Sequence, residues 1–550
     1  MNLLFKKTNY IYFLLIIIIC IGIFTFKDYG IGIEEHFQRK SGFYWLNYLL
    51  NITDFEILKN NADLRYDEIK KFTPNLFPIE LVNYYGVLFD VPLAFFEAFL
   101  NISEPINYFY LRHIAIFTIF LLSSFYFYKI IEIRFKNINI AIFGFLIFVF
   151  TPRIYGNIFF DNKDIFFLSI FTINMYYYLK FNNDQKIKTL ILFSLLCSFS
   201  TSARIIGILI PLSFYIILLF RCMSENNFKK YIRYSVLFSL FYVFFLFLHW
   251  PYLWTLNLHQ WTNFFSPFFF AMNPTVFFNG EFYQSRYLPV YYVPLWIILS
   301  TPVYILFIFG LGILYQIRRF FLRFLKIEKK KNLFKFDLWR SKNENYDLFI
   351  LMNFILILCL YISANLALLS GWRHFYFLNF FLIYYSCFCT YIILKFIRKK
   401  ILLKKYFIFF LSIFFILQIT DLYKYHPFQS VYFNNFISSK NKKKFEIDTQ
   451  SLSRVHGLQT LLQSKKDKIY IATASWTPLE DARSLIPKKL WNRFVFLGTS
   501  NMNEADYIYS NYYYEVDTNY NKKYKIPKNF SLYKNLIIDG TRIYSIYKKN

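Results

Sequence analysis

Two adjacent carboxylic acids, Glu34 and Glu35, follow the first long apolar run of the chain. A hydrocarbon core of about 30 Å takes about 20 helical residues, so a helix that starts near Tyr10 ends near Tyr29. We therefore expect the acid pair at the rim of a membrane, close to lipid headgroups. A solvated acidic loop is the alternative, and this stretch alone does not decide between the two.

Further ionisable residues lie at junctions between later apolar runs. They are Arg153, Asp161, Lys163 and Asp164 in TPRIYGNIFFDNKD, Arg204 in STSAR, Glu281 and Arg286 in FNGEFYQSRYLPVYYVP, and Arg373 and His374 in GWRHFYF. Each has an ordinary structural explanation as well. Asp164 could simply cap a helix, a junction arginine could anchor to lipid headgroups, and Glu281 could pair with Arg286. The functional interpretation is favoured because all these junctions fall on the same predicted side of the membrane.

These residue types suit one kind of reaction. Arginine and lysine bind a phosphate and stabilise it as a leaving group. A carboxylate can deprotonate an acceptor hydroxyl or amine as a general base, and burial near hydrocarbon is expected to raise its pKa towards neutral pH. The pattern therefore predicts transfer of a group from a phosphate-linked lipid, with inversion at a sugar carbon because one base assists one attack.

Composition restricts the class of protein. The chain has 550 residues, of which 57% are hydrophobic, and this composition indicates a polytopic membrane protein. The net charge of +29 does not indicate a nucleic-acid binder, because most basic residues lie in short loops between apolar runs. The six cysteines lie in or beside apolar runs, so neither a disulfide framework nor a thiolate zinc site is predicted. The first apolar run lacks a small-residue cleavage site and is expected to be an uncleaved helix.

Hydropathy predicts about eleven membrane spans. They are 9–29, 111–130, 137–152, 164–180, 188–203, 204–221, 232–250, 292–316, 347–369, 375–396 and 406–421. The connecting segments alternate between short basic loops and longer loops poor in lysine and arginine. The positive-inside rule places the basic set in the cytoplasm, so the N-terminus is expected inside and the C-terminus outside.

Two outer regions complete the predicted fold, which is a mostly α-helical membrane bundle. Residues 1–421 form the transmembrane domain, and its first outer loop, 30–110, carries amphipathic helices such as 84–100. Residues 422–550 form a small α/β outer domain. Its strands are expected at 468–474, 494–498, 505–516 and 543–547.

This arrangement resembles the C-type (GT-C) membrane glycosyltransferases. The resemblance rests on the acid pair after the first span, a long loop with amphipathic helices, and LRH leading into the second span. It is most similar to protein O-mannosyltransferases and to aminoarabinose-type lipid-linked sugar transferases of bacteria. The elements PR-x5-FFDNKD, TSAR-IIG, FNGE, WRHFYF and HPFQSVYFN resemble a bacterial subgroup of this kind.

The resemblance implies roles for individual residues. The first acid of the family's pair falls on Glu34 as general base, where the family usually has Asp, so Glu35 stays an alternative; a second outer acid falls on Asp164, in preference to Asp161. Some relatives hold a divalent metal between such acids and others do not, and both alternatives stay open for Glu34 and Asp164. The residues implied on the phosphate side are Arg153, Lys163, Arg204, Arg373 and His374, and Glu281 and Arg286 are candidates for substrate binding.

The resulting hypothesis is an inverting glycosyltransferase of the bacterial inner membrane with a periplasmic active site. It would move a sugar from a polyprenyl-phosphate-linked donor to a lipid, glycan or protein acceptor. A transporter or flippase of lipid-linked saccharides is the alternative, and it would place charges and broken helices near the bilayer midplane. An assembly protein whose C-terminal domain is a binding module is a third possibility.

Overall fold

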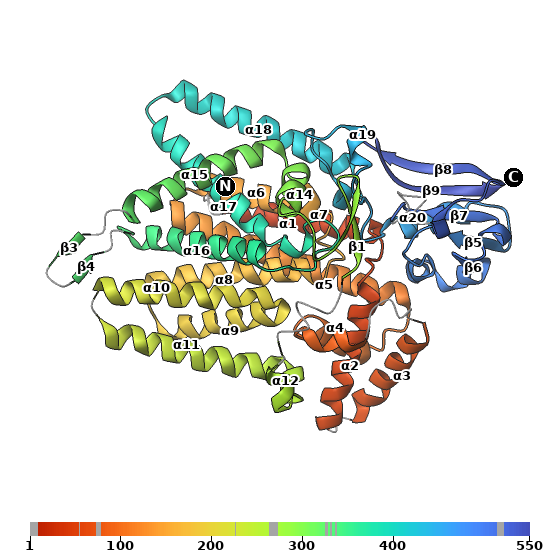
Figure 1. Ribbon diagram of the computed structural model, residues 1–550, viewed down its shortest axis with the longest axis horizontal. Helices are drawn as coiled ribbons and strands as arrows, with labels where there is room; N and C mark the ends of the chain where they lie inside the picture. The colour runs from red at the N-terminus through yellow and green to blue at the C-terminus, as the bar shows by residue number, and fades with distance from the viewer. Residues whose placement is uncertain are drawn as a thin grey trace, which may run out of the picture.

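A computed structural model describes residues 9–53, 56–72, 79–225, 227–262, 264, 273–324, 328–330, 333–335, 338–513 and 522–550. The described part contains a long helical bundle with a small mixed sheet at one end (Figure 1). The bundle helices are α1 (Asn9–Thr25), α5 (Pro105–Phe135), α6 (Ile138–Val149), α8 (Asp164–Asp184), α9 (Ile187–Ala203), α10 (Leu209–Glu225), α11 (Phe228–His249), α14 (Tyr292–Ser300), α15 (Val303–Phe324), α16 (Lys342–Ser363), α17 (Leu378–Phe396) and α18 (Ile401–Lys424).

Eight helices in the described residues are long and apolar enough to cross a membrane, judged by length and composition. The chain is therefore a multi-pass membrane protein, with eight such helices rather than about eleven. Of the other predicted spans, α6 and α9 are shorter apolar helices of 12 and 17 residues, and α8 does not meet the same criterion. A 12-residue helix extends only about 18 Å, which is less than the hydrocarbon thickness.

The predicted span 292–316 is wrong as one helix. Helix α14 ends at Ser300, and α15 begins at Val303. Thr301 between them is extended, as expected for a residue that precedes a proline. The long helix after Pro302 continues to Phe324, so this span starts later and ends later than the hydropathy pattern indicated.

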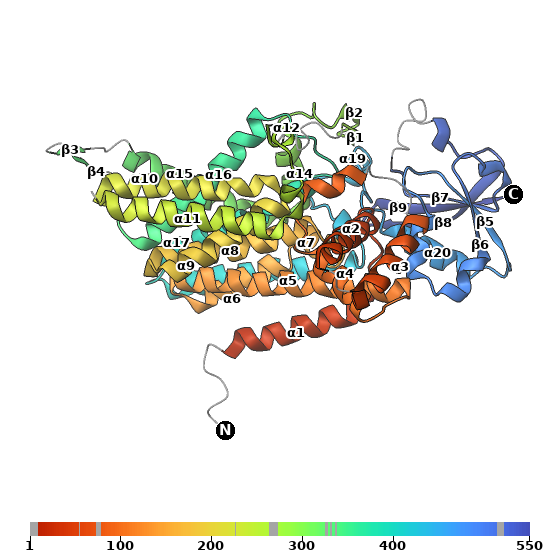
Figure 2. The same cartoon turned by 90° about the horizontal axis from the view of Figure 1, so that it is seen from below.

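Three helices of the predicted first outer loop form a separate layer beside the end of the bundle that carries the sheet (Figures 1 and 2). They are α2 (Glu35–Thr53), α3 (Glu56–Phe72) and α4 (Asp90–Phe99). The predicted amphipathic stretch 84–100 contains α4, whose apolar residues Leu93, Ala94 and Ala98 are buried. The two acids that interrupt the stretch are ion-paired, Asp90 with Arg112 of α5 and Glu97 with Arg39 of α2.

The C-terminal sheet has five strands in the order β6–β5–β7–β9–β8, and the predicted α/β character of this region is confirmed. Strands β5 (Ile469–Thr473), β6 (Phe494–Gly498) and β7 (Tyr507–Ser510) are parallel to their neighbours within this trio, whereas β9 (Thr541–Lys549) is antiparallel to β7 and to β8 (Phe530–Ile538). The sequence analysis missed β8, which is an edge strand with mostly exposed side chains and so lacks an apolar alternation. Helix α20 (Ser453–Leu462) packs beside this sheet.

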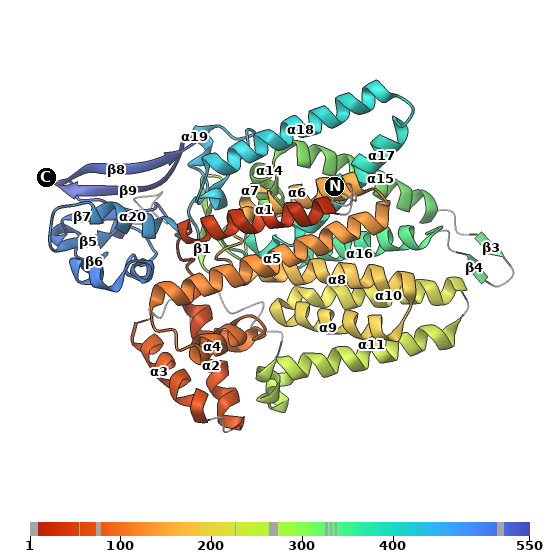
Figure 3. The same cartoon turned by 180° about the vertical axis from the view of Figure 1, so that it is seen from behind.

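The hairpin of β1 (Thr275–Phe278) and β2 (Glu281–Gln284) was also missed. Its two-residue turn, Asn279–Gly280, has positive φ at both positions, which is the geometry that an Asn-Gly pair favours. The remaining short elements are α7 (Pro152–Tyr155), α12 (Leu258–Thr262), α19 (Ser439–Lys442), β3 (Glu328–Lys330) and β4 (Leu333–Lys335). The β3–β4 hairpin lies at the end of the bundle opposite the C-terminal sheet (Figures 1 and 3).

Candidate active site

Four segments that are distant in sequence meet at the end of the bundle next to the C-terminal sheet. Glu34 lies in the turn between α1 and α2, and Asp164 begins α8 as predicted. Arg204 ends α9, and Arg373 lies in the short 3-10 helix Arg373–Phe375 before α17. We refer to Glu34, Asp161, Lys163, Asp164, Arg204 and Arg373 as the junction cluster.

Glu34 and Glu35 face different partners. Glu34 forms an ion pair with Arg373. Glu35 instead turns back to accept a hydrogen bond from the Gly32 backbone N–H at 2.8 Å and lies 3.3 Å from the buried imidazole of His113. Glu35 therefore closes the turn at the start of α2, and Glu34 is the acid of the pair that belongs to the junction cluster.

The turn that carries Glu34 is held from the C-terminal region. The buried guanidinium of Arg454 donates hydrogen bonds to the carbonyl oxygens of Ile31, at 3.2 Å, and Pro478, at 2.6 Å. A Cβ atom at Gly30 would lie 2.3 Å from the Leu452 carbonyl oxygen, so only glycine fits there. Sequence reasoning missed Arg454, because nothing in its local pattern indicates contact with a turn more than four hundred residues earlier.

Asp164 links two of the cations. It forms an ion pair with Arg204, and its Oδ2 atom lies 3.9 Å from Nε of Arg373. Asp161 supports this arrangement from the preceding turn, because its Oδ1 atom accepts the Asp164 backbone N–H at 2.9 Å and so caps α8. The two acids thus have distinct positions, with Asp164 between arginines and Asp161 at the helix start.

Lys163 and Tyr85 form a second contact in the cluster. The Lys163 ammonium lies 3.1 Å from the centre of the Tyr85 ring, and burial lowers the pKa of Lys163. Burial alone would raise the pKa of Tyr85, but Lys163 and Arg204 lower it below its usual range. Tyr85 was not singled out from the sequence; it lies in the aromatic-rich outer loop, where no spacing marks it.

The pKa values of two carboxylates move in opposite directions. Burial would raise the pKa of Glu34, but Arg373 and Lys163 outweigh it and lower this pKa to about 2. Burial raises the pKa of Asp161 to about 7, with the Glu34 charge adding to the rise and Arg373 opposing it. The expectation that burial raises the pKa of the base is therefore wrong for Glu34, because Arg373 and Lys163 lie close to its carboxylate. Among these two carboxylates, it is the pKa of Asp161 that is raised.

Unsatisfied polar atoms remain inside the cluster. Oδ2 of Asp161, Oδ2 of Asp164 and the Nε atoms of Arg204 and Arg373 are buried without a hydrogen-bond partner among the described residues. Buried polar groups in proteins are normally hydrogen-bonded, so such a concentration of exceptions indicates a place for a polar ligand. Three basic side chains thus face three carboxyl groups, and the raised pKa of Asp161 favours its neutral form.

The donor set does not fit a divalent metal between Glu34 and Asp164. Each carboxylate already has an arginine partner, and Lys163 adds a third positive charge that would repel a cation. Within the described ranges, no group of three or more His, Cys, Asp or Glu side chains is placed to hold a metal ion.

Three of the predicted residues have other surroundings. The Arg153 guanidinium packs 4.8 Å from the Trp296 ring and donates to the Tyr432 carbonyl oxygen, which is a structural contact. Glu281 is exposed on the β1–β2 hairpin and accepts a hydrogen bond from Tyr283. Arg286 lies just after the same hairpin and is half-buried, so the buried junction cluster contains neither residue.

His374 adjoins the cluster. Burial, together with the charges of Arg204 and Arg373, lowers its pKa well below the usual value, so its imidazole is neutral at pH 7. A neutral imidazole still carries one N–H donor. Its role on the phosphate side stays a prediction, as do the chemical roles of the other cluster residues.

Comparison with known proteins finds similarity at the level of the fold. No protein-family model matches the chain, and no curated protein matches it. The fold is similar to the crystal structure of ArnT from Cupriavidus metallidurans bound to undecaprenyl phosphate, with a TM-score of 0.40 and 9% identity over 84% of this chain and 88% of that chain. The likeness agrees with the resemblance that the sequence indicated, but at this level it carries no argument about activity.

Proposed function

We propose that this protein is a membrane glycosyltransferase that uses a polyprenyl-phosphate-linked sugar as donor. The observation that carries the proposal is the junction cluster, in which three cations and three carboxylates from four segments meet with buried, unsatisfied donors and acceptors. Such a set offers N–H donors for a phosphate and a carboxylate for a proton, at the end of an apolar bundle that a lipid carrier can reach.

Arg373 and Arg204 are the proposed phosphate ligands, with Lys163 beside them. Their charges are balanced by Glu34 and Asp164. A donor phosphate would compete with Glu34 for Arg373. Once that guanidinium binds phosphate, it stabilises the Glu34 carboxylate less, and the pKa of Glu34 rises from its low resting value. Donor binding would therefore convert a poor base into a better one.

Glu34 is the proposed general base. The acceptor oxygen attacks the anomeric carbon of the sugar, and its proton passes to the Glu34 carboxylate. The bond between that carbon and the phosphate oxygen breaks, and its electron pair leaves with the polyprenyl phosphate. The arginines stabilise the charge that develops on this leaving group. A single displacement of this kind inverts the anomeric configuration.

The test compares envelope glycolipids and glycoproteins by mass spectrometry in cells that express the wild-type chain, Glu34→Gln, Asp161→Asn or no protein. Glu504→Gln, an exposed outer acid, is the matched control. We expect Glu34→Gln to lose transfer by about 10²–10⁴-fold, the usual contribution of a general base, and unmodified acceptor to accumulate as it does without the protein. Asp161→Asn and Glu504→Gln should retain the modification.

Two outcomes would contradict the proposal. Full modification in cells that express Glu34→Gln would remove the assigned base. Accumulation of carrier-linked sugar on the inner face in cells without the protein would indicate a flippase instead. For the first outcome, the level of the Glu34→Gln protein in membranes must match that of the wild type.

A further inference from the structure

A groove lies at the end of the bundle opposite the junction cluster, between α6, α17 and α18. Its volume is about 850 Å³, within the usual range for a ligand site. Helix α18 runs along one edge of the bundle (Figures 1 and 3), and only 11% of its most apolar window is buried. The groove therefore opens towards the surface that the membrane covers.

The groove has an apolar wall and a basic mouth. Phe143 and Leu146 of α6 and Leu411 and Phe415 of α18 line its length. From the first turn of α18 to Phe415 the helix rises about 16 Å, enough to accompany much of an acyl chain. The mouth is lined by four basic residues, Lys136, Lys395, Arg398 and Lys404.

The residues that the structure describes do not neutralise the charge at the mouth. No aspartate or glutamate lines the groove. None of the four basic side chains forms an ion pair with any residue that the structure describes. Lys136 follows α5, Lys395 and Arg398 lie at the end of α17, and Lys404 is in the first turn of α18. Three separate segments thus contribute basic side chains to the mouth of the groove.

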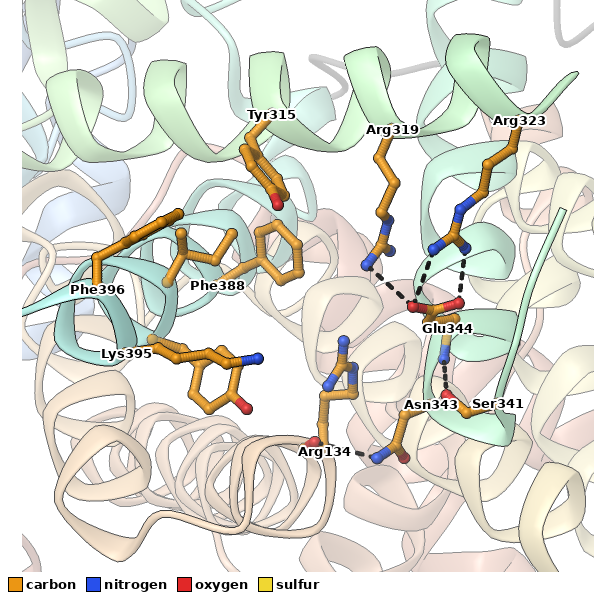
Figure 4. Close-up of a pocket in the computed structure, with 12 residues that line it drawn as sticks. Arg134, Tyr315, Arg319, Arg323, Ser341, Asn343, Glu344, Phe388, Lys395 and Phe396 are labelled. Atoms are coloured by element: carbon orange, nitrogen blue, oxygen red, sulfur yellow. Dashed lines mark hydrogen bonds and ion pairs between the residues drawn. The ribbon is translucent and has the colours of Figure 1, made fainter. Parts of the chain in front are cut away.

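A neighbouring cavity of about 660 Å³ shows the contrasting case (Figure 4). There Arg319 and Arg323 of α15 are directed at Glu344 of α16. Arg134 and Arg319 also bind Asp347, each at 2.6 Å. These arginines link α5, α15 and α16 through ion pairs, so their charges are neutralised by Glu344 and Asp347. Lys395 lines both spaces but takes no part in this network.

We propose that the groove binds an anionic phospholipid, with an acyl chain between α6 and α18 and the phosphate among Lys136, Lys395, Arg398 and Lys404. Basic residues next to apolar spans attract anionic headgroups. The apolar wall selects a lipid over a free anion, and the unneutralised mouth selects an anionic over a zwitterionic lipid. This inference does not depend on the proposed glycosyltransferase activity.

The experiment measures lipids retained by the full-length protein. The chain is delipidated in detergent, exposed to phosphatidylglycerol or phosphatidylcholine, and examined by native mass spectrometry. We expect retention of one phosphatidylglycerol and little phosphatidylcholine. Exchanging the four basic residues for glutamine should weaken retention by up to about 600-fold, since each of the four cations near an anionic headgroup contributes about a factor of five. Inorganic phosphate in excess should not displace the lipid.

Two further variants make the result specific. The control exchanges Lys186, Lys188, Lys229 and Arg233 for glutamine; these residues lie at the same end of the bundle but outside the groove, and this variant should bind as the wild type does. Ser412→Trp fills the groove while leaving all four cations in place, and it should also lose the lipid. If the fourfold variant does not fold, Lys395→Gln and Lys404→Gln are measured singly.

Four results would overturn the inference. They are equal retention of phosphatidylcholine, unchanged binding in both the fourfold and the Ser412→Trp variants, an equal loss in the control variant, and displacement by inorganic phosphate.

Discussion

The carboxyl group of Asp161 makes the stability of the junction cluster depend on pH. Its Oδ1 atom caps α8, and its Oδ2 atom is buried without a hydrogen-bond partner among the described residues. Burial raises its pKa from 3.8 to about 7. Because the folded state binds a proton more tightly than the unfolded state, the free energy of unfolding should fall as the pH rises from about 4 to about 7 and then level off.

The magnitude follows from the shift. A rise of about three pKa units corresponds to about 4 kcal/mol of stability that is present below pH 4 and absent above pH 7. Asp161→Asn removes the titration. Asparagine caps a helix about as well as aspartate, so the contact with the Asp164 N–H should survive. The variant should therefore be more stable than the wild type above pH 7.

The assay is the thermal unfolding midpoint in detergent across the pH range, for the wild type, Asp161→Asn and Asp467→Asn. Asp467 is exposed on the C-terminal region and serves as the control. The difference between wild type and Asp161→Asn isolates one group from others that titrate in the same range. The reasoning fails if the two midpoints differ by the same amount at every pH, or if Asp161→Asn is less stable at pH 8.

Three other substitutions test the surrounding structure. Glu35→Gln weakens a charge-assisted hydrogen bond and the contact with His113, so we expect a loss of about 1–2 kcal/mol of stability, seen as a lower unfolding midpoint; an unchanged midpoint would contradict the structural role. Arg39→Met leaves Glu97 buried without its partner and should cost about 3–5 kcal/mol, whereas the double variant with Glu97→Leu should recover most of it; no recovery would mean that the pair is not coupled. Burial raises the pKa of Glu446 to about 8, so stability should fall as the pH rises from about 4.5 towards 8, and Glu446→Gln should abolish that part of the dependence in the same midpoint assay.

Local patterns predicted much of the architecture, because long apolar runs must become helices in a membrane. Ten of the eleven predicted spans each coincide mainly with one α-helix, two of them (9–29 and 204–221) together with a short 3-10 helix. The exception, 292–316, breaks at Pro302. The edge strand β8 was not predicted, because its side chains are mostly exposed and show no apolar alternation. Strand β8 depended on its position at the edge of the sheet, whereas the break at Pro302 and the Asn279–Gly280 turn each carry a local signal.

The sequence predicted which loops carry the residues of the site, but not how these residues contact one another. Glu34, Asp164, Arg204 and Arg373 were all identified from charge next to apolar runs, and the structure brings them together. The sequence could not distinguish Glu34 from Glu35, because the difference between them depends on the turn that directs the Glu35 side chain back to the Gly32 backbone. The packing of Arg153 against Trp296 was equally hidden, since an arginine over an aromatic ring leaves no local signal.

The junction cluster is not a property of the bundle alone. The turn that carries Glu34 is packed between the bundle and the segment around Leu452, and Arg454 is hydrogen-bonded to its backbone. The division into residues 1–421 and 422–550 therefore separates the catalytic candidate from the group that positions it. Under the proposed mechanism, this turn would keep Glu34 near Arg373 when a phosphate binds that arginine, so the exchange would need little reorganisation. The C-terminal region therefore helps to form the site, because it packs against the turn that carries Glu34 and is hydrogen-bonded to the backbone of that turn.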